Sequence, residues 1–433
     1  MKTRALVRTA VSDLALLVLA FVIATWLRYG DLTFRELGTR GVLWNIFVTT
    51  LIASVIGSAV AAAMSATAPP RPSYNRAMVM VVITFFTLAA LIVLFRPWFS
   101  RSHLALTGVL WLVLVLWSRW AVRRRPWLEQ AVVISSADDL IDQLRRVPHL
   151  RIVDVIDPAQ VGSIAAPPQD AFIAIDLSDS WSDDVSRFIS AASVGGREVR
   201  AFTQLYEEHT GKVPLSHVSE GWEMESSLRR TLPFIPFKTA TDIAIVLLTA
   251  VIWLPILVVT GVVVAIVDGQ PVFFTQERIG RLGRPVRIYK FRTMVPHDGP
   301  VETLATDDDP RITRLGRMLR RYRLDEVPQL INVLRGELAI VGPRPEWVST
   351  AERYRQVIPF YDQRSLIRPG ITGWAQVNLG ATSDERGAMA KLSYDFYYLK
   401  HMSPMLDLEV LARSIRTVFR GDAGRRRRRT STS

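Results

Sequence analysis

Asp325 and Glu326 are neighbouring carboxylates. They follow a cluster of arginines that includes Arg320. Pro328 and the apolar run 330–334 come directly after them. A proline before an apolar run predicts a helix with the proline in its first turn. Free N–H groups at a helix start favour carboxylates and also attract phosphate. The stretch therefore indicates either an ordinary capped helix with a solvated basic face or a site that handles a phosphate ester.

The second interpretation requires a carboxylate to approach an anionic substrate. Guanidinium groups and Mg²⁺ reduce the repulsion, and a carboxylate nucleophile can then form an acyl-phosphate. Because adjacent residues on a helix point about 100° apart, we expect different roles for Asp325 and Glu326. Arg344 lies between two prolines, on a stiff turn that could direct its guanidinium into the site.

The composition indicates a membrane protein. The chain has 433 residues, is 49% hydrophobic and carries a net charge of +13. High hydropathy together with this positive charge suits a membrane protein that faces an anionic leaflet or anionic substrates. The apolar residues come in long runs, which disfavours a nucleic-acid binder. The absence of cysteine excludes disulfides and thiolate metal sites.

Four apolar segments open the chain, at 11–27, 42–64, 77–95 and 104–121. Each approaches the roughly 20 residues needed to cross a bilayer. The first lacks a small-residue cleavage site, so we expect a retained helix instead of a signal peptide. The distribution of arginines favours both ends of this four-helix transmembrane region, 1–125, on the cytoplasmic side.

The next region, 126–232, has the pattern of a small α/β domain. Short apolar runs at 131–134 and 171–175 suit parallel strands, and polar helix-like stretches follow them. The turn after the first run, 135–138, has no glycine and ends in an acid, so a phosphate cradle is missing. We predict a degenerate Rossmann-like domain with a structural or regulatory role instead of a working dinucleotide site.

A fifth apolar segment, 243–267, contains no charge but has Pro255 at its middle. Proline removes one helix hydrogen bond and disfavours helical geometry at Leu254. Basic residues flank the segment on both sides, which argues against a full crossing. We therefore predict a re-entrant helix over 240–267, broken at Leu254 and Pro255, with a proline-kinked span as the alternative.

Short polar motifs follow in a fixed order around the Asp325-Glu326 pair: 274–280, 289–294, 309–316, 336–345, 368–377 and 394–398. This region, about 237–419, resembles the bacterial sugar transferase family, the monotopic phosphoglycosyl transferases. The four spans and the degenerate α/β domain resemble its long members, the undecaprenyl-phosphate hexose-1-phosphate transferases. The sequence departs from the family pattern before Leu324. The family usually has two small hydroxyl residues there, and this chain has Tyr322 and Arg323.

The resemblance implies transfer of a sugar-1-phosphate, expected to be a hexose-1-phosphate, from a UDP-sugar to undecaprenyl phosphate, with release of UMP. It implies Asp325 as nucleophile and Mg²⁺ ligand, with Glu326 as its partner. Substrate or phosphate binding is expected of seven further residues: Arg320, Arg344, Arg368, Gln376, Lys290, Arg292 and Gln276. The catalytic domain is expected at 233–420, mostly α-helical, with a basic disordered tail at 421–433 and a homodimer as one expected assembly.

These expectations place a multi-pass protein in the bacterial inner membrane, with its catalytic domain on the cytoplasmic face and in contact with lipid. The product would initiate exopolysaccharide, capsule or O-antigen-type synthesis. One alternative is a catalytically inactive scaffold or regulator of polysaccharide assembly. Another is a transporter or flippase. Against it, we expect no charged residues to line the four-span bundle, as a polar pathway would require.

Overall fold

The structure is a computed structural model. It describes residues 2–30, 40–63, 74–95, 100–124, 128–163, 171–177, 183–218, 234–295, 309–379 and 384–420, so the predicted tail 421–433 lies outside it. The chain divides into two compact units, and each is described by itself. One comprises Met1–Trp127 and Ser403–Leu408, and the other comprises Leu128–Met402 and Glu409–Ser433.

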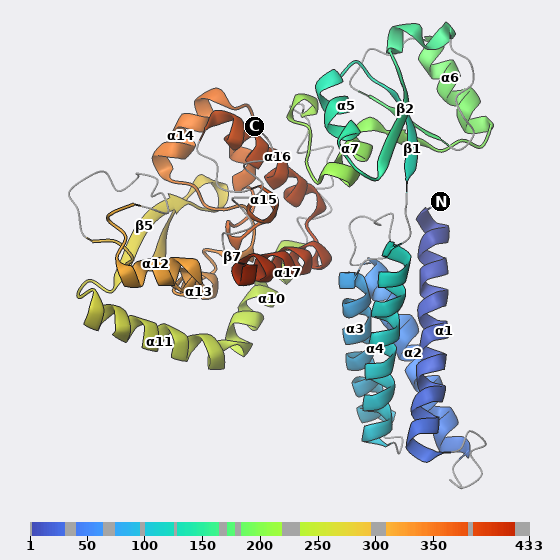
Figure 1. The fold of residues 1–433 in the computed structure, drawn as a ribbon, viewed down its shortest axis with the longest axis horizontal. Helices are drawn as coiled ribbons and strands as arrows, with labels where there is room; N and C mark the ends of the chain where they lie inside the picture. Colours follow the sequence, from blue (N-terminus) through green and yellow to red (C-terminus); the bar gives the residue numbers. More distant parts are fainter. Residues whose placement is uncertain are drawn as a thin grey trace. The chain divides into compact units, whose positions relative to one another are not determined.

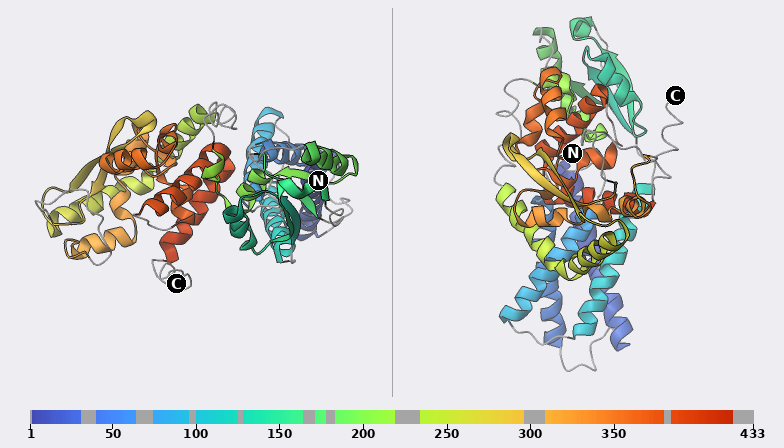
Figure 2. Two further views of the ribbon diagram at one scale, coloured as in Figure 1. Left: turned by 90° about the horizontal axis from the view of Figure 1, so that it is seen from above. Right: turned by 90° about the vertical axis from the view of Figure 1, so that its left-hand side faces the viewer.

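Four apolar helices make up the N-terminal region (Figure 1): α1 Lys2–Tyr29, α2 Arg40–Ala63, α3 Tyr74–Phe95 and α4 Arg101–Arg124. Figure 2 shows them running alongside one another. Three contain stretches long and apolar enough to cross a membrane: Val7–Tyr29, Arg76–Leu94 and Arg101–Arg124. In α2 the described apolar stretch, Asn45–Ala61, is shorter. The four predicted helices are confirmed as helices, and three of them as candidate spans.

The interior of this bundle is not free of charge, and that part of the argument against a transporter is wrong. Asp13 on α1 and Arg119 on α4 form an ion pair with an Oδ2–Nη2 distance of 2.5 Å, and both side chains are only 5% exposed. The indole of Trp111 donates to the carbonyl of Asp13 at 2.9 Å. Counting apolar runs missed this pair because each residue is a single charge within its run. The pair joins α1 to α4, and its two opposite charges cancel.

The second unit begins with an all-parallel sheet in the order β2-β1-β3-β4. Its elements are β1 Glu129–Ile134, α5 Asp138–Arg145, β2 Leu150–Ile156, η1 Pro158–Ser163, β3 Phe172–Ile175, α6 Asp183–Val194, β4 Val199–Ala201, α7 Phe202–Thr210 and η2 Leu215–His217. Separate apolar cores cover its two faces, which explains the unbroken apolar runs of β1 and β3. In the sheet, β2 lies on one side of β1 and β3 lies on the other, so the direction of strand addition changes after β2.

Two helices meet at Thr249: α10 Phe234–Leu248 and α11 Ala250–Val267. The predicted position of the break is therefore wrong, because Leu254 and Pro255 lie inside α11. Thr249 Oγ1 donates to the carbonyl of Ile245 at 2.7 Å, and the N–H of Thr249 donates to the same oxygen at 3.0 Å, an arrangement that often bends helices. Pro255 is the sixth residue of α11, beyond the first turn, so it removes one hydrogen bond from the helix interior without ending the helix.

The remaining elements follow these helices in the sequence. They are β5 Phe273–Ile279, η3 Arg281–Gly283, β6 Pro285–Phe291, α12 Arg314–Arg321, η4 Leu324–Glu326, α13 Gln329–Leu334, β7 Ala339–Val341, α14 Val348–Val357, η5 Tyr361–Ser365, β8 Gly370–Thr372, α15 Trp374–Asn378, α16 Glu385–His401 and α17 Pro404–Arg420. β5 and β6 form an antiparallel hairpin, and β7 pairs with β8 in parallel.

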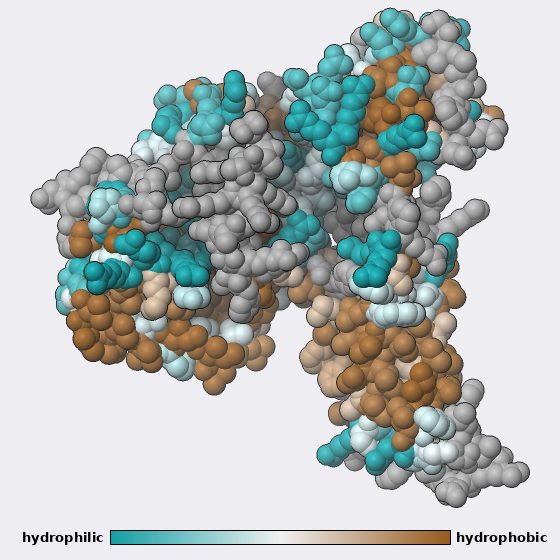
Figure 3. Space-filling view, in the orientation of Figure 1, coloured by the Kyte–Doolittle hydropathy of each residue, from teal (hydrophilic) through white to brown (hydrophobic). Residues whose placement is uncertain are grey.

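One apolar core anchors α10 and α11 to the rest of this region. It contains Val246, Trp253, Ile288, Val333 and Leu338, from α10, α11, β6, α13 and the residue before β7. The other side of α11 is exposed and apolar, as Figure 3 shows. The stretch Ala250–Val267 is long and apolar enough to cross a membrane, so its exposed face is suited to lipid.

Candidate active site

Asp325 and Glu326 lie in the short 3-10 turn η4, ahead of α13, and both are buried. The alternative of an ordinary capped helix does not hold: Pro328 occupies the N-cap position of α13, and no side chain caps the helix. Arg323 enters the turn in the left-handed region, with φ of 55°. The charge of the two carboxylates is therefore governed by neighbouring side chains instead of a capped helix start.

Three cations converge on Glu326. Its Oε1 lies 3.1 Å from Nη2 of Arg344 and 3.4 Å from Nζ of Lys290, and its Oε2 lies 3.2 Å from Nη1 of Arg323. Burial alone would raise the pKa of Glu326, but the charges of Arg344, Lys290 and Arg323 hold it well below its usual range. Glu326 is thus a fixed anion whose oxygens are already used.

Asp325 has the opposite environment. Burial, and then the adjacent charge of Glu326, raise its pKa, although Lys290, Arg320 and Arg323 partly offset the increase. Within the described part of the chain its carboxylate has no hydrogen bond or ion pair. A desolvated carboxylate without its own cation is a reactive group, and its oxygens are available to a substrate or a metal.

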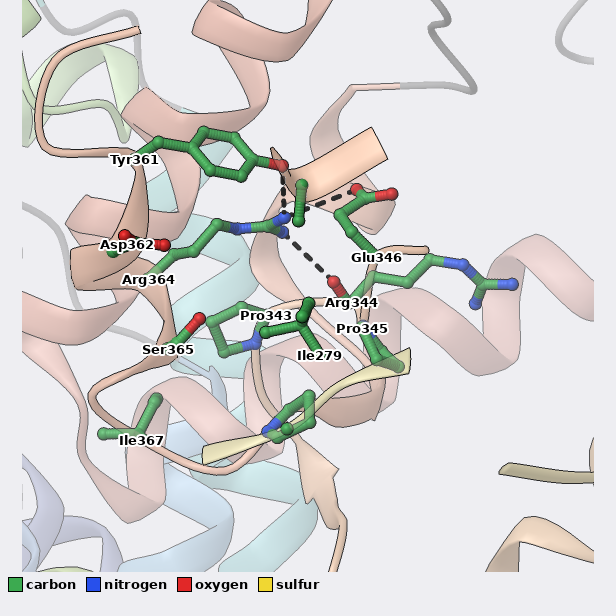
Figure 4. Close-up of a pocket in the computed structure, with 13 residues that line it drawn as sticks. Ile279, Pro343, Arg344, Pro345, Glu346, Tyr361, Asp362, Arg364, Ser365 and Ile367 are labelled. Atoms are coloured by element: carbon green, nitrogen blue, oxygen red, sulfur yellow. Dashed lines mark hydrogen bonds and ion pairs between the residues drawn. The ribbon is translucent and has the colours of Figure 1, made fainter. Parts of the chain in front are cut away.

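The turn that carries Arg344 is held from behind by a buried network (Figure 4). Arg364 donates to the carbonyl of Arg344 at 3.1 Å and to Tyr361 Oη at 2.9 Å, and its Nη1 lies 3.4 Å from Glu346. It also donates to Asp395 at 2.6 Å. The Arg344 side chain extends away from this network. The stiff turn predicted from its two prolines therefore has a second source of rigidity.

Of the seven binding residues predicted from sequence, three are brought to the carboxylates. Arg344 and Lys290 pair with Glu326. Arg320 lies near enough for its charge to lower the pKa of Asp325. Its guanidinium is positioned by Thr293, to whose Oγ1 its Nε donates at 3.0 Å.

The other four have different neighbours. The buried Arg292 guanidinium donates to the carbonyls of Asp268, Gly269 and Gln270 at the end of α11, and Arg368 donates to Thr239 on α10. Gln276 accepts from Arg278 at 2.9 Å, and Gln376 donates weakly to Ile371 at 3.4 Å. One buried amide atom of each glutamine has no partner in the described residues: Gln276 Nε2 and Gln376 Oε1.

Sequence reasoning missed several residues that position the site. Asn332 is fully buried, donates to the carbonyl of Arg287 at 2.8 Å and accepts from the backbone of Tyr289 at 3.2 Å, which fixes α13 against β6. Asp395 belongs to a motif noted in the sequence, but its partner Arg364 is 31 residues away. Only the fold brings such pairs together.

The carboxylates of the site fit Mg²⁺ that is held by a single protein ligand. Across the described residues, no three His, Asp or Glu side chains gather into a metal cage. Mg²⁺ is commonly held by one or two carboxylates together with waters and substrate phosphates. The oxygens of Glu326 are engaged by cations, which leaves Asp325 as the available protein ligand.

Comparisons with known proteins match the region that contains these carboxylates. The sequence profile described as bacterial sugar transferase matches residues 234–421. An exopolysaccharide production protein of Rhizobium leguminosarum is 35% identical over 181 residues, which is 40% of this chain and 90% of that protein. The chain belongs to the bacterial sugar transferase family.

Longer family members extend the similarity. A UDP-N-acetylgalactosamine-undecaprenyl-phosphate N-acetylgalactosaminephosphotransferase of Aeromonas hydrophila is 33% identical over 272 residues, 63% of each chain. A UDP-glucose:undecaprenyl-phosphate glucose-1-phosphate transferase of Escherichia coli is 41% identical over 187 residues, 42% of this chain and 40% of that one. The matched regions thus span less than two thirds of these two relatives.

Proposed function

We propose that this protein transfers a sugar-1-phosphate from a UDP-sugar to undecaprenyl phosphate and releases UMP. The observation that carries the proposal is the pairing of two unlike carboxylates. Glu326 is surrounded by three cations, whereas the adjacent Asp325 is desolvated and has no cation of its own. The names of the Aeromonas and Escherichia relatives support the same reaction class.

In the first step, an Asp325 carboxylate oxygen attacks the phosphorus that bears the sugar. The bond from that phosphorus to the UMP oxygen breaks, and UMP leaves with the electron pair. In the second step, an oxygen of undecaprenyl phosphate attacks the same phosphorus. The acyl-phosphate bond breaks, which regenerates the Asp325 carboxylate and leaves a diphosphate-linked sugar.

Glu326 holds the cations that receive the substrate. The side chains of Arg344, Lys290 and Arg323 are 32%, 23% and 41% exposed, so each is fixed at Glu326 and still reaches solvent. Such pre-positioned donors stabilise charge developing on transferred phosphates. Bound Mg²⁺, held by Asp325, would neutralise phosphate charge during the transfer.

We further propose a hexose, glucose or galactose, as the transferred sugar, as expected from the long family members. The relatives' names include both glucose and N-acetylgalactosamine, so a panel of UDP-sugars is required. The catalytic region would lie on the cytoplasmic face of the bacterial inner membrane, with α10 and α11 entering and leaving on that side. There the soluble donor and the lipid acceptor can meet, and the product would initiate a surface glycan.

The test is release of UMP from UDP-sugars by the purified full chain with undecaprenyl phosphate and Mg²⁺. Wild type should release UMP with at least one UDP-hexose, and Asp325→Asn should not. Incubation with the UDP-sugar alone should yield a phosphosugar adduct on Asp325, detected by mass spectrometry of peptides. Equal UMP release by wild type and Asp325→Asn would refute the nucleophile. No release with any UDP-sugar would refute the reaction.

A further inference from the structure

A cavity of about 670 Å³ lies within the second unit, away from Asp325 and Glu326. Its walls come from the turn after β1 with α5, the segment between α7 and η2, and α16, represented by Ser136, Lys212 and Ser393. Its volume falls in the range of about 300–1,000 Å³ that is usual for small-molecule sites.

The cavity lies at the edge of the parallel sheet where ligands commonly bind. The chain reverses direction in the sheet between β1 and β3, and ligands of such sheets bind outside the carboxyl ends of the strands at that point. Ser135 follows β1 and donates to Asp176, which follows β3, at 2.7 Å. His217 of η2 lies 2.9 Å from the same carboxylate. These bonds fix η2, which carries one wall, to the sheet.

Further hydrogen bonds fix the segment that carries Lys212. On one side of this residue, the carbonyl of Gly211 accepts from the indole of Trp374 at 2.8 Å. On the other side, the N–H of Val213 donates to the carbonyl of Ser393 on α16 at 3.0 Å. Lys212 is therefore held on a short stretch that is tied at both neighbours, as a preformed site requires.

The charge distribution around the cavity selects a ligand type. Lys212 is the one cation in its lining, and the described residues offer this ammonium a ring contact with Tyr394 at 5.2 Å but no carboxylate. Burial alone lowers its pKa, consistent with a missing counter-charge. Asp138 and Asp139 line another part of the cavity and can accept hydroxyl groups.

These features exclude a dinucleotide and leave a simpler molecule. A second phosphate would find no second cation, and the turn after β1 has no glycine to bring its backbone close. Leu140 and Met389 offer apolar contact to a ring. We propose that this cavity binds a monophosphate that also carries ring hydroxyls, either a nucleoside monophosphate or a sugar phosphate, with the phosphate at Lys212.

Helix α16 connects this cavity to the catalytic region. Met389 and Ser393 line the cavity, while Lys391 and Asp395 on the same helix pair with Glu346 and Arg364 behind the Arg344 turn. If the protein releases UMP as proposed above, UMP is the nucleoside monophosphate present at the membrane surface. Only this choice of probe rests on the proposed function, because binding itself can be measured without turnover.

The experiment is calorimetric titration of the full chain in nanodiscs with UMP and, separately, glucose 1-phosphate. Inorganic phosphate and uridine are the single-group controls. We expect one of the two monophosphates to bind in a Lys212-dependent way: Lys212→Met should weaken that site about tenfold or more, and Lys212→Arg should retain it. Lys290→Met is the matched control, because it affects UMP bound near Glu326 and not this cavity.

A cavity-filling variant, Met389→Trp, keeps the proposal testable if Lys212→Met does not fold. It should abolish the same binding event while the unliganded protein melts as wild type does. Wild-type binding of both monophosphates in a folded Lys212 variant, or in a folded Met389→Trp, would overturn the proposal. Binding of inorganic phosphate as tight as that of either monophosphate would also overturn it. UMP release by Lys212→Met reports separately on the transferase.

Discussion

Arg364 donates from Nη2 to the main-chain carbonyl of Arg344 at 3.1 Å, while the Arg344 side chain reaches Glu326. Arg364 is itself paired with Asp395 at 2.6 Å, and both side chains are almost completely buried, at 6% and 1% exposure. The position of one cation beside the carboxylates thus depends on an ion pair that contacts neither of them. Arg364 and Asp395 are positioning residues.

Arg364→Lys should lower the rate of UMP release while leaving the acceptor KM nearly unchanged. A lysine can pair with Asp395 but lacks the planar fork that also reaches the carbonyl of Arg344. Arg364→Met should cost about 3–5 kcal/mol of stability, because it leaves Asp395 buried without a partner. Rates and chemical denaturation of the purified variants measure both effects.

The control for this prediction is Arg355→Lys, because Arg355 pairs with the largely exposed Asp362. An exposed pair contributes at most about 1 kcal/mol, so rate and stability should stay near wild type. A wild-type rate in Arg364→Lys would show that the network does not position Arg344.

Asp325→Asn and Glu326→Gln should change stability in opposite directions at neutral pH. The folded state raises the pKa of Asp325, so ionised Asp325 opposes folding, and its amide should stabilise the protein. The folded state lowers the pKa of Glu326, so its charge favours folding. Glu326→Gln should cost about 1–3 kcal/mol, less than a fully buried pair because its three cations are partly exposed.

The pH dependence gives a second check on these two residues. The stabilisation of Asp325→Asn should be absent below the ordinary carboxyl pKa and should grow as pH rises through the raised pKa of Asp325. The cost of Glu326→Gln should be present above the ordinary carboxyl range and should shrink as pH falls toward the lowered pKa of Glu326. Denaturation midpoints in buffers from acid to neutral pH measure both. Shifts of the same sign would contradict the two environments.

Arg292 and Lys290 lie two positions apart in the sequence and should respond differently to removal of their charge. Arg292→Gln loses donors to three carbonyls after α11 and should cost about 1–3 kcal/mol of stability, with the substrate KM of the folded protein unchanged. Lys290→Met removes a cation from Glu326 and should reduce UMP release with a smaller change in stability. Denaturation and steady-state kinetics on both variants separate the two roles. Equal changes in stability and UMP release in the two variants would contradict this difference in roles.

Local pattern was sufficient for part of the fold. The apolar runs predicted four N-terminal helices and the parallel strands β1 and β3, because burial on both faces leaves an unbroken apolar sequence. It failed at the break between α10 and α11. Proline is the strongest local signal, yet α10 ends at Leu248 and the chain bends at Thr249, where the Trp253 indole donates to the carbonyl of Val246 across the bend.

The site shows the same division between local and long-range information. The motifs around Asp325, Glu326 and Arg344 identified the residues that the fold brings together. They also selected Arg292, whose guanidinium instead binds the carbonyls after α11. A motif records that a residue is required at a place without stating whether it contacts substrate or supports the backbone. The buried pair of Arg364 and Asp395 is invisible to local reading because its members are distant in sequence.

The membrane arrangement of α10 and α11 is open to a direct test, since the chain has no cysteine of its own. Phe237 in the first turn of α10 and Arg287 on β6 are both exposed, and they lie before and after the uncharged stretch 243–267. If the helices enter and leave on one face, Phe237→Cys and Arg287→Cys should both resist an impermeant maleimide in intact cells and react after permeabilisation. Arg101→Cys, at the start of α4 and expected on the opposite face, should react in intact cells. Protection of Phe237→Cys together with labelling of Arg287→Cys would mean that α11 crosses the bilayer, which would place the carboxylates on the periplasmic side, away from the soluble donor.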